Sequence, residues 1–476
     1  MILYKKAILA ITLSIVWAIM LVSCESNLQH DIDYSRAASL ARTLSYEKIV
    51  SGLKFHDWNK EQDPALLMVY CEALVEMRHK LPSVFRSQSI PHRVKQFAQG
   101  YYNLVGGDWR TSLNLFLELT KAPRMEDKVW GLIGMLDHAF YTEAISNMKG
   151  PLNVIQKISE KQAAIVPSWV LPYYQTYFEL HSGNYSLLKS FIEKNRLNLE
   201  PDVYFDIYIQ LLIRHSRFDE ARTILGDMDP ELRESQILLL HEAEIIRLQK
   251  GPNDSQEFLK IKIQQNPKRW LLQQEYANLL IDEGKTSDGF GVLKKIARDR
   301  PFDVITQLAY AEQLTYQGQI EKAQKIILKE LRNPAELFYY NIIYARLFYT
   351  KGRLDKARVA IKRAQVLFPK NYEAFWIEFH IAKKNANYIE AEKILNNILK
   401  IEPDDVSALA ELMELNFLKQ KWDTVLEIKK RIGATNRYID PNIREKIERL
   451  NRRTAGGRGV GTSAIRLRNL LMSYVK

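Results

Sequence analysis

Residues 338–371 read FYYNIIYARLFYTKGRLDKARVAIKRAQVLFPKN. Large apolar side chains lie on both sides of Gly352, and Pro369 stands near the end of the stretch. A glycine permits the backbone conformation of a tight turn between two helices, and a proline cannot continue a helix. The small residues Ala345 and Ala357 allow paired helices to approach closely. The stretch therefore predicts one unit of two antiparallel helices.

The pattern of this unit recurs every 34 residues in both directions. With Phe338 as position 1, small residues occupy positions 8 and 20, glycine position 15, a large apolar residue position 24 and proline position 32. Position 8 is Ala243, Ala277, Ala311 and Ala345; position 20 is Ala221, Ser255, Gly289, Ala323, Ala357 and Ala391; position 15 includes Gly284, Gly318 and Gly352; position 24 is Phe191, Leu225, Leu259, Leu293, Ile327, Ile361 and Leu395; and position 32 includes Pro267, Pro301, Pro369 and Pro403. An ordinary helical bundle would not hold one register in this way.

This pattern resembles the tetratricopeptide repeat, a helix–turn–helix unit. The resemblance implies an all-α fold, a right-handed superhelical solenoid of stacked repeats. It covers eight units, at 168–201, 202–235, 236–269, 270–303, 304–337, 338–371, 372–405 and 406–439. The first and last units depart from it: Gln175 and Leu187, and Met413 and Val425, replace the small residues. We interpret these two units as the ends of the solenoid.

The regions on either side of the repeats are expected to be helical without the register. An N-terminal helical region is predicted at 31–165. In it, 31–88 should hold two or three helices, with Pro64 beginning one and Pro82 ending it. One degenerate repeat is expected at about 91–123, followed by a helix pair at 127–165 that turns near Gly150-Pro151. Cys71 is predicted to be a small buried residue. The C-terminal region, 440–476, is predicted to be a basic helix and tail; the tail either docks on anionic lipid or an acidic partner, or packs loosely on the last repeat.

The first 24 residues have the pattern of an export signal. Lys5 and Lys6 precede an uncharged, mostly apolar run from Ala7 to Ser23. The end of this run, Leu21 to Cys24, resembles the bacterial lipobox, which implies cleavage before Cys24 and diacylglyceration of its thiol. An uncleaved single-pass signal anchor is the alternative. Both interpretations place the rest of the chain outside the cytoplasm, because the two lysines stay inside.

The resemblance to lipoproteins also implies a cellular localisation. Residue 25 is Glu, where an Asp is the usual signal for retention in the inner membrane. We therefore expect a protein anchored by lipid in a bacterial cell envelope, in the outer membrane at its periplasmic face. An inner-membrane anchor with a periplasmic domain is the alternative.

Motifs for catalysis and metal binding are missing from the sequence. It contains no HExxH, GxSxG, GxxxxGK[ST] or CxxC, and the nine histidines are scattered. We expect neither an enzyme, nor a metal site, nor a cofactor; the alternative is an envelope enzyme whose site lies in residues 31–165. The net charge of +12 does not indicate nucleic-acid binding, because such a partner conflicts with export and no module of aromatic and basic residues is present.

The expected functional surface is the concave groove that the first helices of tetratricopeptide repeats line. Carried over by register, positions 2, 5, 9 and 12 point inward. The candidate partner-binding residues are Arg247, Asn278, Tyr339, Arg346, Tyr349, Trp376, His380 and Lys383. We expect a wet aromatic strip with positive charge, suited to a segment that carries acidic residues.

The interpretation that follows is a membrane-anchored extracytoplasmic scaffold or adaptor. Its expected partners are other envelope proteins or peptide segments, and the membrane through the lipid anchor. By resemblance, such lipoproteins support envelope assembly, secretion or polysaccharide export. The lysine and asparagine set by which chaperone-binding arrays hold a C-terminal carboxylate is absent, since only Asn278 matches it.

Overall fold

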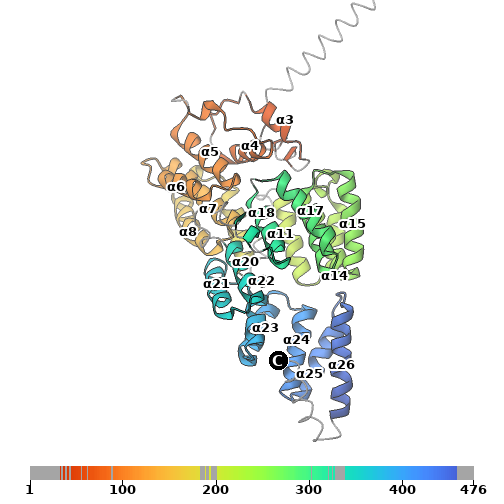
Figure 1. Cartoon of the computed structure of the whole chain (residues 1–476). Helices are drawn as coiled ribbons and strands as arrows, with labels where there is room; N and C mark the ends of the chain where they lie inside the picture. The colour runs from red at the N-terminus through yellow and green to blue at the C-terminus, as the bar shows by residue number, and fades with distance from the viewer. Residues whose placement is uncertain are drawn as a thin grey trace, which may run out of the picture. The chain divides into compact units, whose positions relative to one another are not determined.

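The computed structural model describes residues 33–457, apart from 34–35, 38–39, 42–43, 55, 62, 87–88, 183–187, 189–191, 194–200, 302, 320, 324 and 327–337. These residues form helices and no strands, so the predicted all-α fold is confirmed (Figure 1). The described residues belong to two compact units, which are treated separately below. Unit 1 is 1–138 with 158–167, and unit 2 is 139–157 with 168–476.

Unit 1 is a set of short antiparallel helices. It contains α3 (Tyr46–Gly52), α4 (Pro64–Glu76), the 3-10 turn η1 (Ser83–Arg86), α5 (His92–Val105), α6 (Trp109–Thr120) and most of α7 (Met125–Tyr141). Pro64 begins α4 as predicted, and the carboxylate of Asp63 caps this helix by accepting from the Ala65 amide at 2.9 Å. Pro82 does not end α4. The helix ends at Glu76, where Arg78 adopts a left-handed backbone with φ of 56°.

The pair α5 and α6 is packed as a degenerate repeat. Gly107, between the two helices, has φ of 86°. Gly100 lets the helices approach, because a Cβ atom there would lie 2.6 Å from the Phe116 ring. Cys71 is fully buried beneath α5, as predicted, and burial raises the pKa of its thiol far above the ordinary value.

The next helix pair turns earlier than the sequence indicates. We expected a turn near Gly150-Pro151, but α7 ends at Tyr141 and α8 spans Lys149–Lys161. Pro151 lies in the first turn of α8, where a missing amide hydrogen costs nothing and the fixed φ suits the helix. The prediction was wrong because it treated this proline as a helix breaker.

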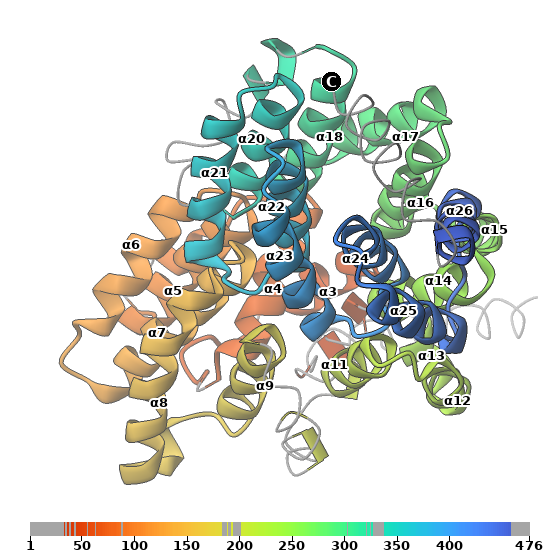
Figure 2. The same ribbon diagram turned by 90° about the horizontal axis from the view of Figure 1, so that it is seen from below.

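Unit 2 is a superhelical solenoid of paired helices. Its helices are α9 (Val170–Ser182), α11 (Pro201–Arg214), α12 (Phe218–Asp227), α13 (Pro230–Arg233), α14 (Gln236–Lys250), α15 (Pro252–Gln265), α16 (Trp270–Asp282), α17 (Thr286–Asp299), α18 (Val304–Tyr316), α20 (Phe338–Thr350), α21 (Leu354–Leu367), α22 (Tyr372–Lys384), α23 (Tyr388–Ile401), α24 (Val406–Leu418), α25 (Trp422–Ala434) and α26 (Pro441–Gly457). In Figure 2 the helices from α14 to α26 follow one another along a curved path. Their spacing is that of tetratricopeptide-type repeats.

The small residues lie where the two helices of a repeat meet. Ala277 and Gly289 illustrate this contact, since a Cβ atom on Gly289 would lie 2.6 Å from the carbonyl oxygen of Ala277. One repeat earlier, the Ser255 hydroxyl donates to the carbonyl of Ala243 at 2.9 Å. The larger residues of position 24 fill the core beside this contact, and Leu259 and Leu293 are fully buried. Positions 8 and 20 therefore have the role predicted for them.

Position 15 has the same backbone geometry whether or not it is glycine. Gly284, Gly318 and Gly352 have φ values of 83°, 74° and 71°. The non-glycine residues Ala386 and Gln420 have φ of 56° and 59° at the same position. The turn thus imposes a left-handed residue that glycine adopts most readily.

The C-terminal end of the solenoid contacts its early repeats. The Arg437 guanidinium donates to the Ser216 hydroxyl at 3.0 Å and to Glu402 at 2.9 Å. The Tyr438 amide donates to the carbonyl of Leu248 at 2.6 Å. Because the segment between α25 and α26 is joined in this way to the segment from α11 to α14, the curvature of unit 2 is held by hydrogen bonds between residues far apart in the sequence.

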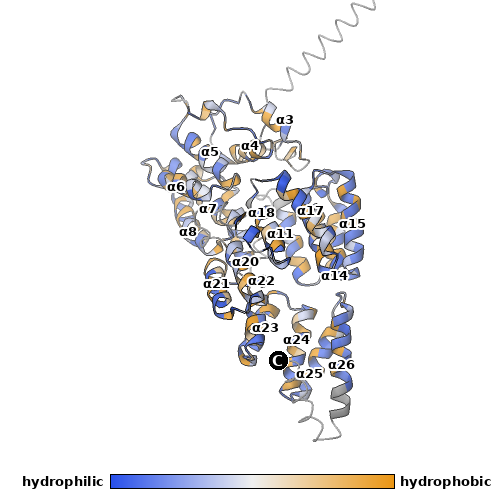
Figure 3. Cartoon of the chain, viewed as in Figure 1, coloured by the Kyte–Doolittle hydropathy of each residue, from blue (hydrophilic) through white to orange (hydrophobic). Residues whose placement is uncertain are grey.

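The expectations for the leader and for the tail after residue 457 fall outside the described residues, whereas the range expected to begin with a basic helix contains α26. Cys24 and the leader precede them, and 458–476 follow them. In the described ranges, no helix combines the length and the apolar character that crossing a membrane requires. Figure 3 shows α26 with a mainly hydrophilic surface, and its buried residues Ile447 and Leu450 join the core around α24.

Candidate binding groove

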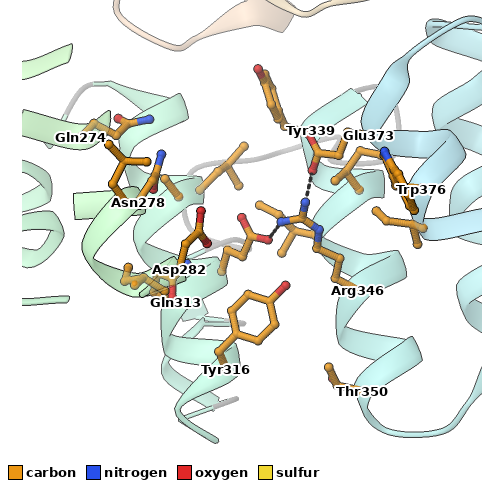
Figure 4. Close-up of a pocket in the computed structure, with 18 of the residues that line it drawn as sticks. Gln274, Asn278, Asp282, Gln313, Tyr316, Tyr339, Arg346, Thr350, Glu373 and Trp376 are labelled. Atoms are coloured by element: carbon orange, nitrogen blue, oxygen red, sulfur yellow. Dashed lines mark hydrogen bonds and ion pairs between the residues drawn. The ribbon is translucent and has the colours of Figure 1, made fainter. Parts of the chain in front are cut away.

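The concave side of unit 2 holds a cavity of about 1030 Å³. Its walls are the first helices of successive repeats, α16, α18, α20 and α22, with a contribution from α14 (Figure 4). Among the lining residues are seven of the eight groove residues chosen by register: Arg247, Asn278, Tyr339, Arg346, Tyr349, Trp376 and His380. The structure therefore brings these seven residues together, and their role in binding stays a prediction.

The wall formed by α16 shows a position that the register argument missed. Gln274, Asn278 and Asp282 follow one another at four-residue spacing and face the cavity (Figure 4). Asp282 is at position 13 of its repeat, as are Tyr316 and Thr350 of the next two repeats, which also line the cavity. Since position 13 is one helical turn beyond position 9, this periodicity could have found all three residues.

Arg346 stands at the centre of the cavity between two carboxylates. Its guanidinium forms an ion pair with Glu373 at 2.6 Å and a second with Glu312 (Figure 4). The three residues come from α20, α22 and α18, so this cluster joins three successive repeats. Burial works against the positive charge, but the two carboxylates outweigh it and raise the pKa of Arg346.

The charge of the groove is opposite to the one we expected. Its lining contains four carboxylates, Glu275, Asp282, Glu312 and Glu373, against two guanidiniums. Burial, as the main cause, raises the pKa of Glu275, Asp282 and Glu373. The expectation of a positive strip was wrong for two reasons. It overlooked Glu373 at position 2, and it did not count the positions of Glu275 and Asp282.

Lys383, the eighth candidate, contributes no positive charge to the cavity lining. Its ammonium group contacts Glu411 at 2.6 Å and Glu414 at 3.2 Å, both on α24. Lys446 of α26 contacts the same two carboxylates at 2.8 and 2.7 Å. This four-residue cluster is electrically balanced.

Aromatic rings form much of the remaining surface of the groove. Tyr316, Tyr339, Tyr349 and Trp376 all line it. Tyr339 is hydrogen-bonded to Glu143, which follows α7 in the chain and also belongs to unit 2. Burial raises the pKa of Glu143 to about 7, although the hydrogen bond to Tyr339 opposes this shift. Nothing in the sequence around Glu143 indicates this contact, because it depends on how the solenoid curves.

Metal-binding chemistry has no candidate in the described part of the chain. No group of three or more His, Cys, Asp or Glu side chains there could hold a metal ion. The arrangement of the groove instead combines carboxylates, aromatic rings and amides, which are groups that bind through charge, stacking and hydrogen bonds.

Comparisons with known proteins find helical repeat proteins among the similar solved structures and carry no argument about this chain. No protein-family model matches the sequence, and no curated protein matches it. The similar solved structures include the Cut9–Hcn1 hetero-tetramer of APC/C, with 12% identity, a TM-score of 0.44, and 88% of this chain and 82% of that chain covered. Yeast Tom70 is similar at 10% identity and a TM-score of 0.35, over 91% of this chain and 95% of that one.

A tetratricopeptide repeat protein from Parabacteroides merdae is also similar. The identity is 15% and the TM-score 0.29, over 50% of this chain and 98% of the other. The assignment of the repeats rests on the helix pairs of this chain, with their buried small residues and left-handed turns.

Proposed function

We propose that this protein is a scaffold that binds other proteins in the groove of unit 2. The observation that carries the proposal is a cavity whose lining comes from five first helices and combines aromatic rings with charged side chains. Such surfaces are typical of binding hot spots, where a few aromatic anchors supply most of the affinity. Catalysis and nucleic-acid binding are not part of this proposal.

The test is a crosslinked pull-down from intact envelopes with groove variants. Trp376→Ala and Tyr349→Ala remove aromatic surface from the groove, and loss of such an anchor costs a complex about 2 kcal/mol or more. We expect each variant to lower partner capture at least tenfold while its thermal unfolding changes little. Ile389→Ala is the matched control, since Ile389 is 80% exposed on α23, outside the groove. Capture that survives both aromatic substitutions would contradict the proposal.

We also propose that the scaffold is held in a bacterial cell envelope through Cys24. The support is the lipobox-like sequence at the end of the apolar run, together with the two lysines that precede the run. In this proposal the acyl chains anchor the protein in the outer membrane at its periplasmic face, where it serves an assembly, secretion or polysaccharide-export machine.

Mass spectrometry of the N-terminus tests the anchor. Acylation at Cys24 and removal of the preceding residues are expected in the wild type, and Cys24→Ala should abolish both. An unmodified and uncleaved N-terminus in the wild type would favour the alternative, an inner-membrane signal anchor with a periplasmic domain.

A further inference from the structure

The groove of unit 2 carries negative charge that its own cations do not balance. Arg346 is already paired with Glu312 and Glu373. The remaining lining carboxylates, Glu275 and Asp282, have only Arg247 as a further lining cation.

Arg247 itself is shared with a carboxylate outside the lining. It lies 3.7 Å from Glu244, on the same helix. Since Glu244 draws on the same guanidinium, Arg247 does not balance the charges of both Glu275 and Asp282.

This local charge is the reverse of the charge of the whole protein. The chain carries +12 overall, so its general electrostatic field favours acidic molecules. An acidic segment that entered the groove would, however, meet four carboxylates in a partly desolvated space. Like charges brought together at an interface repel each other, and the groove therefore selects against such a segment.

The aromatic residues of the groove add a second preference for positive charge. Tyr316, Tyr339 and Trp376 line the same cavity as Glu275 and Asp282. The face of an aromatic ring attracts an ammonium or guanidinium group, and this attraction grows when water is excluded. Carboxylates and rings on facing walls can therefore hold one cationic side chain from two sides.

We propose that the groove binds a segment of a partner protein that carries lysine or arginine side chains, which Glu275 and Asp282 contact. This inference rests on the proposed scaffold function and names the chemistry of its partner. The cationic group lies between α16 and the aromatic residues of α18, α20 and α22. The alkyl stem of a lysine or arginine packs against the rings.

The chain itself offers one competing occupant. Residues 458–476 contain Arg458, Arg466, Arg468 and Lys476 and no acidic residue. We assign the groove to a partner because α26, which these residues follow, is held on α24 through Lys446 and through its buried residues Ile447 and Leu450. Deletion of 458–476 distinguishes the two occupants.

To test the inference, a random decapeptide library is passed over the immobilised full chain, and the retained peptides are identified by mass spectrometry. We expect lysine and arginine to be enriched at least fivefold over aspartate and glutamate. The double variant Glu275→Gln, Asp282→Asn should lose this enrichment. Glu257→Gln, an exposed position on α15, removes the same type of charge outside the groove and should keep it.

Three results would overturn the inference. They are enrichment of acidic residues, no retained class of peptide, and an enrichment that the double variant preserves. Enrichment that emerges only after deletion of 458–476 would assign the groove to the chain's own tail instead. If the pull-down depends on Trp376 and Tyr349 but the library shows no basic preference, the scaffold function stands and only this inference fails.

Discussion

In the pocket section of the solenoid, from α16 to the start of α22, the guanidinium of Arg346 lies between two carboxylates, Glu312 and Glu373. In the second section, from the end of α22 to α26, two ammonium groups, of Lys383 and Lys446, share two carboxylates, Glu411 and Glu414. Both sections are built from the same type of repeat, a pair of antiparallel helices. The difference is that α26 adds a cation to the second section, whereas the cavity in the first section remains open and negative.

The pKa values of the carboxylates follow this difference. Burial raises the pKa of Glu275, Asp282 and Glu373 in the pocket section. Burial also works to raise the pKa of Glu414, but the charges of Lys446 and Lys383 outweigh burial and hold this pKa below the ordinary value. The ion pairs of the second section therefore stabilise the fold, whereas in the pocket section Glu275 and Asp282 are the carboxylates that we propose contact a ligand.

The largest expected effect comes from removing the central cation of the pocket section. Arg346→Met leaves Glu312 and Glu373 partly buried without their partner, which lowers the free energy of unfolding by about 2–4 kcal/mol at pH 8. The loss should shrink at pH 5, because the raised pKa of Glu373 lets it take up a proton. Urea denaturation at both pH values measures this.

A convex-face arginine provides the control for this variant. Arg358 of α21 lies 3.9 Å from Glu390, and an exposed pair of this kind contributes at most about 0.5 kcal/mol. Equal losses for Arg346→Met and Arg358→Met would show that the central cluster is not buried enough to matter.

The second prediction concerns the pH dependence that Glu143 causes. Its pKa is about 7 in the folded protein and about 4.5 when unfolded, so the folded state binds the proton more tightly. The groups that face it are Tyr339, Glu373 and Tyr177. Stability from this group is therefore fully present below pH 4.5 and is lost as the pH rises towards 7 and above.

Glu143→Gln removes this titration and keeps a hydrogen-bond acceptor for Tyr339. We expect the variant to be more stable than the wild type by about 2 kcal/mol at pH 8 and equally stable at pH 4.5. Thermal unfolding at the two pH values checks the sign. A variant that follows the wild type at both would show that Glu143 is solvated in the folded state.

The third prediction concerns the balanced cluster of the second section. Lys383→Met should cost about 1 kcal/mol, because Glu411 and Glu414 keep Lys446 as a partner. Lys446→Met should cost a similar amount, but the double variant should lose more than the sum, since two adjacent carboxylates then repel each other. A double-mutant cycle by urea denaturation measures the coupling, and strictly additive losses would contradict the shared cluster.

The smallest effect should come from the turns of the repeats. Ala386 has a positive φ that glycine adopts without strain, and Ala386→Gly should stabilise the protein by about 0.5 kcal/mol. Gly352→Ala in the pocket section should do the reverse, by about 1 kcal/mol, although an added Cβ atom there meets nothing within 4 Å. Opposite signs in chemical denaturation would confirm that the shared left-handed backbone favours glycine at both turns; equal signs would refute it.

The sequence by itself determined the repeat and most of the groove lining. Gly352, Ala345 and the residues at the same positions every 34 residues act within one pair of helices, so their roles follow from local geometry. The same register selected seven of the lining residues, Arg346 and Trp376 among them. Sequence reasoning failed upstream of the repeats, at the pair α7 and α8, where Pro151 lies in the first turn of a helix instead of ending one.

Only the tertiary structure decided the sign of the net charge of the groove lining and the partners of its charged side chains. Arg346 meets carboxylates from the repeats before and after its own, and Glu143 reaches Tyr339 from a distant part of the chain. Arg437 and Tyr438 bind residues of α11 to α14 in a similar way. A repeat pattern specifies which residues face inward, but which of their charges neutralise one another depends on the curvature that stacking produces, because electrostatic interactions act through space and not along the sequence.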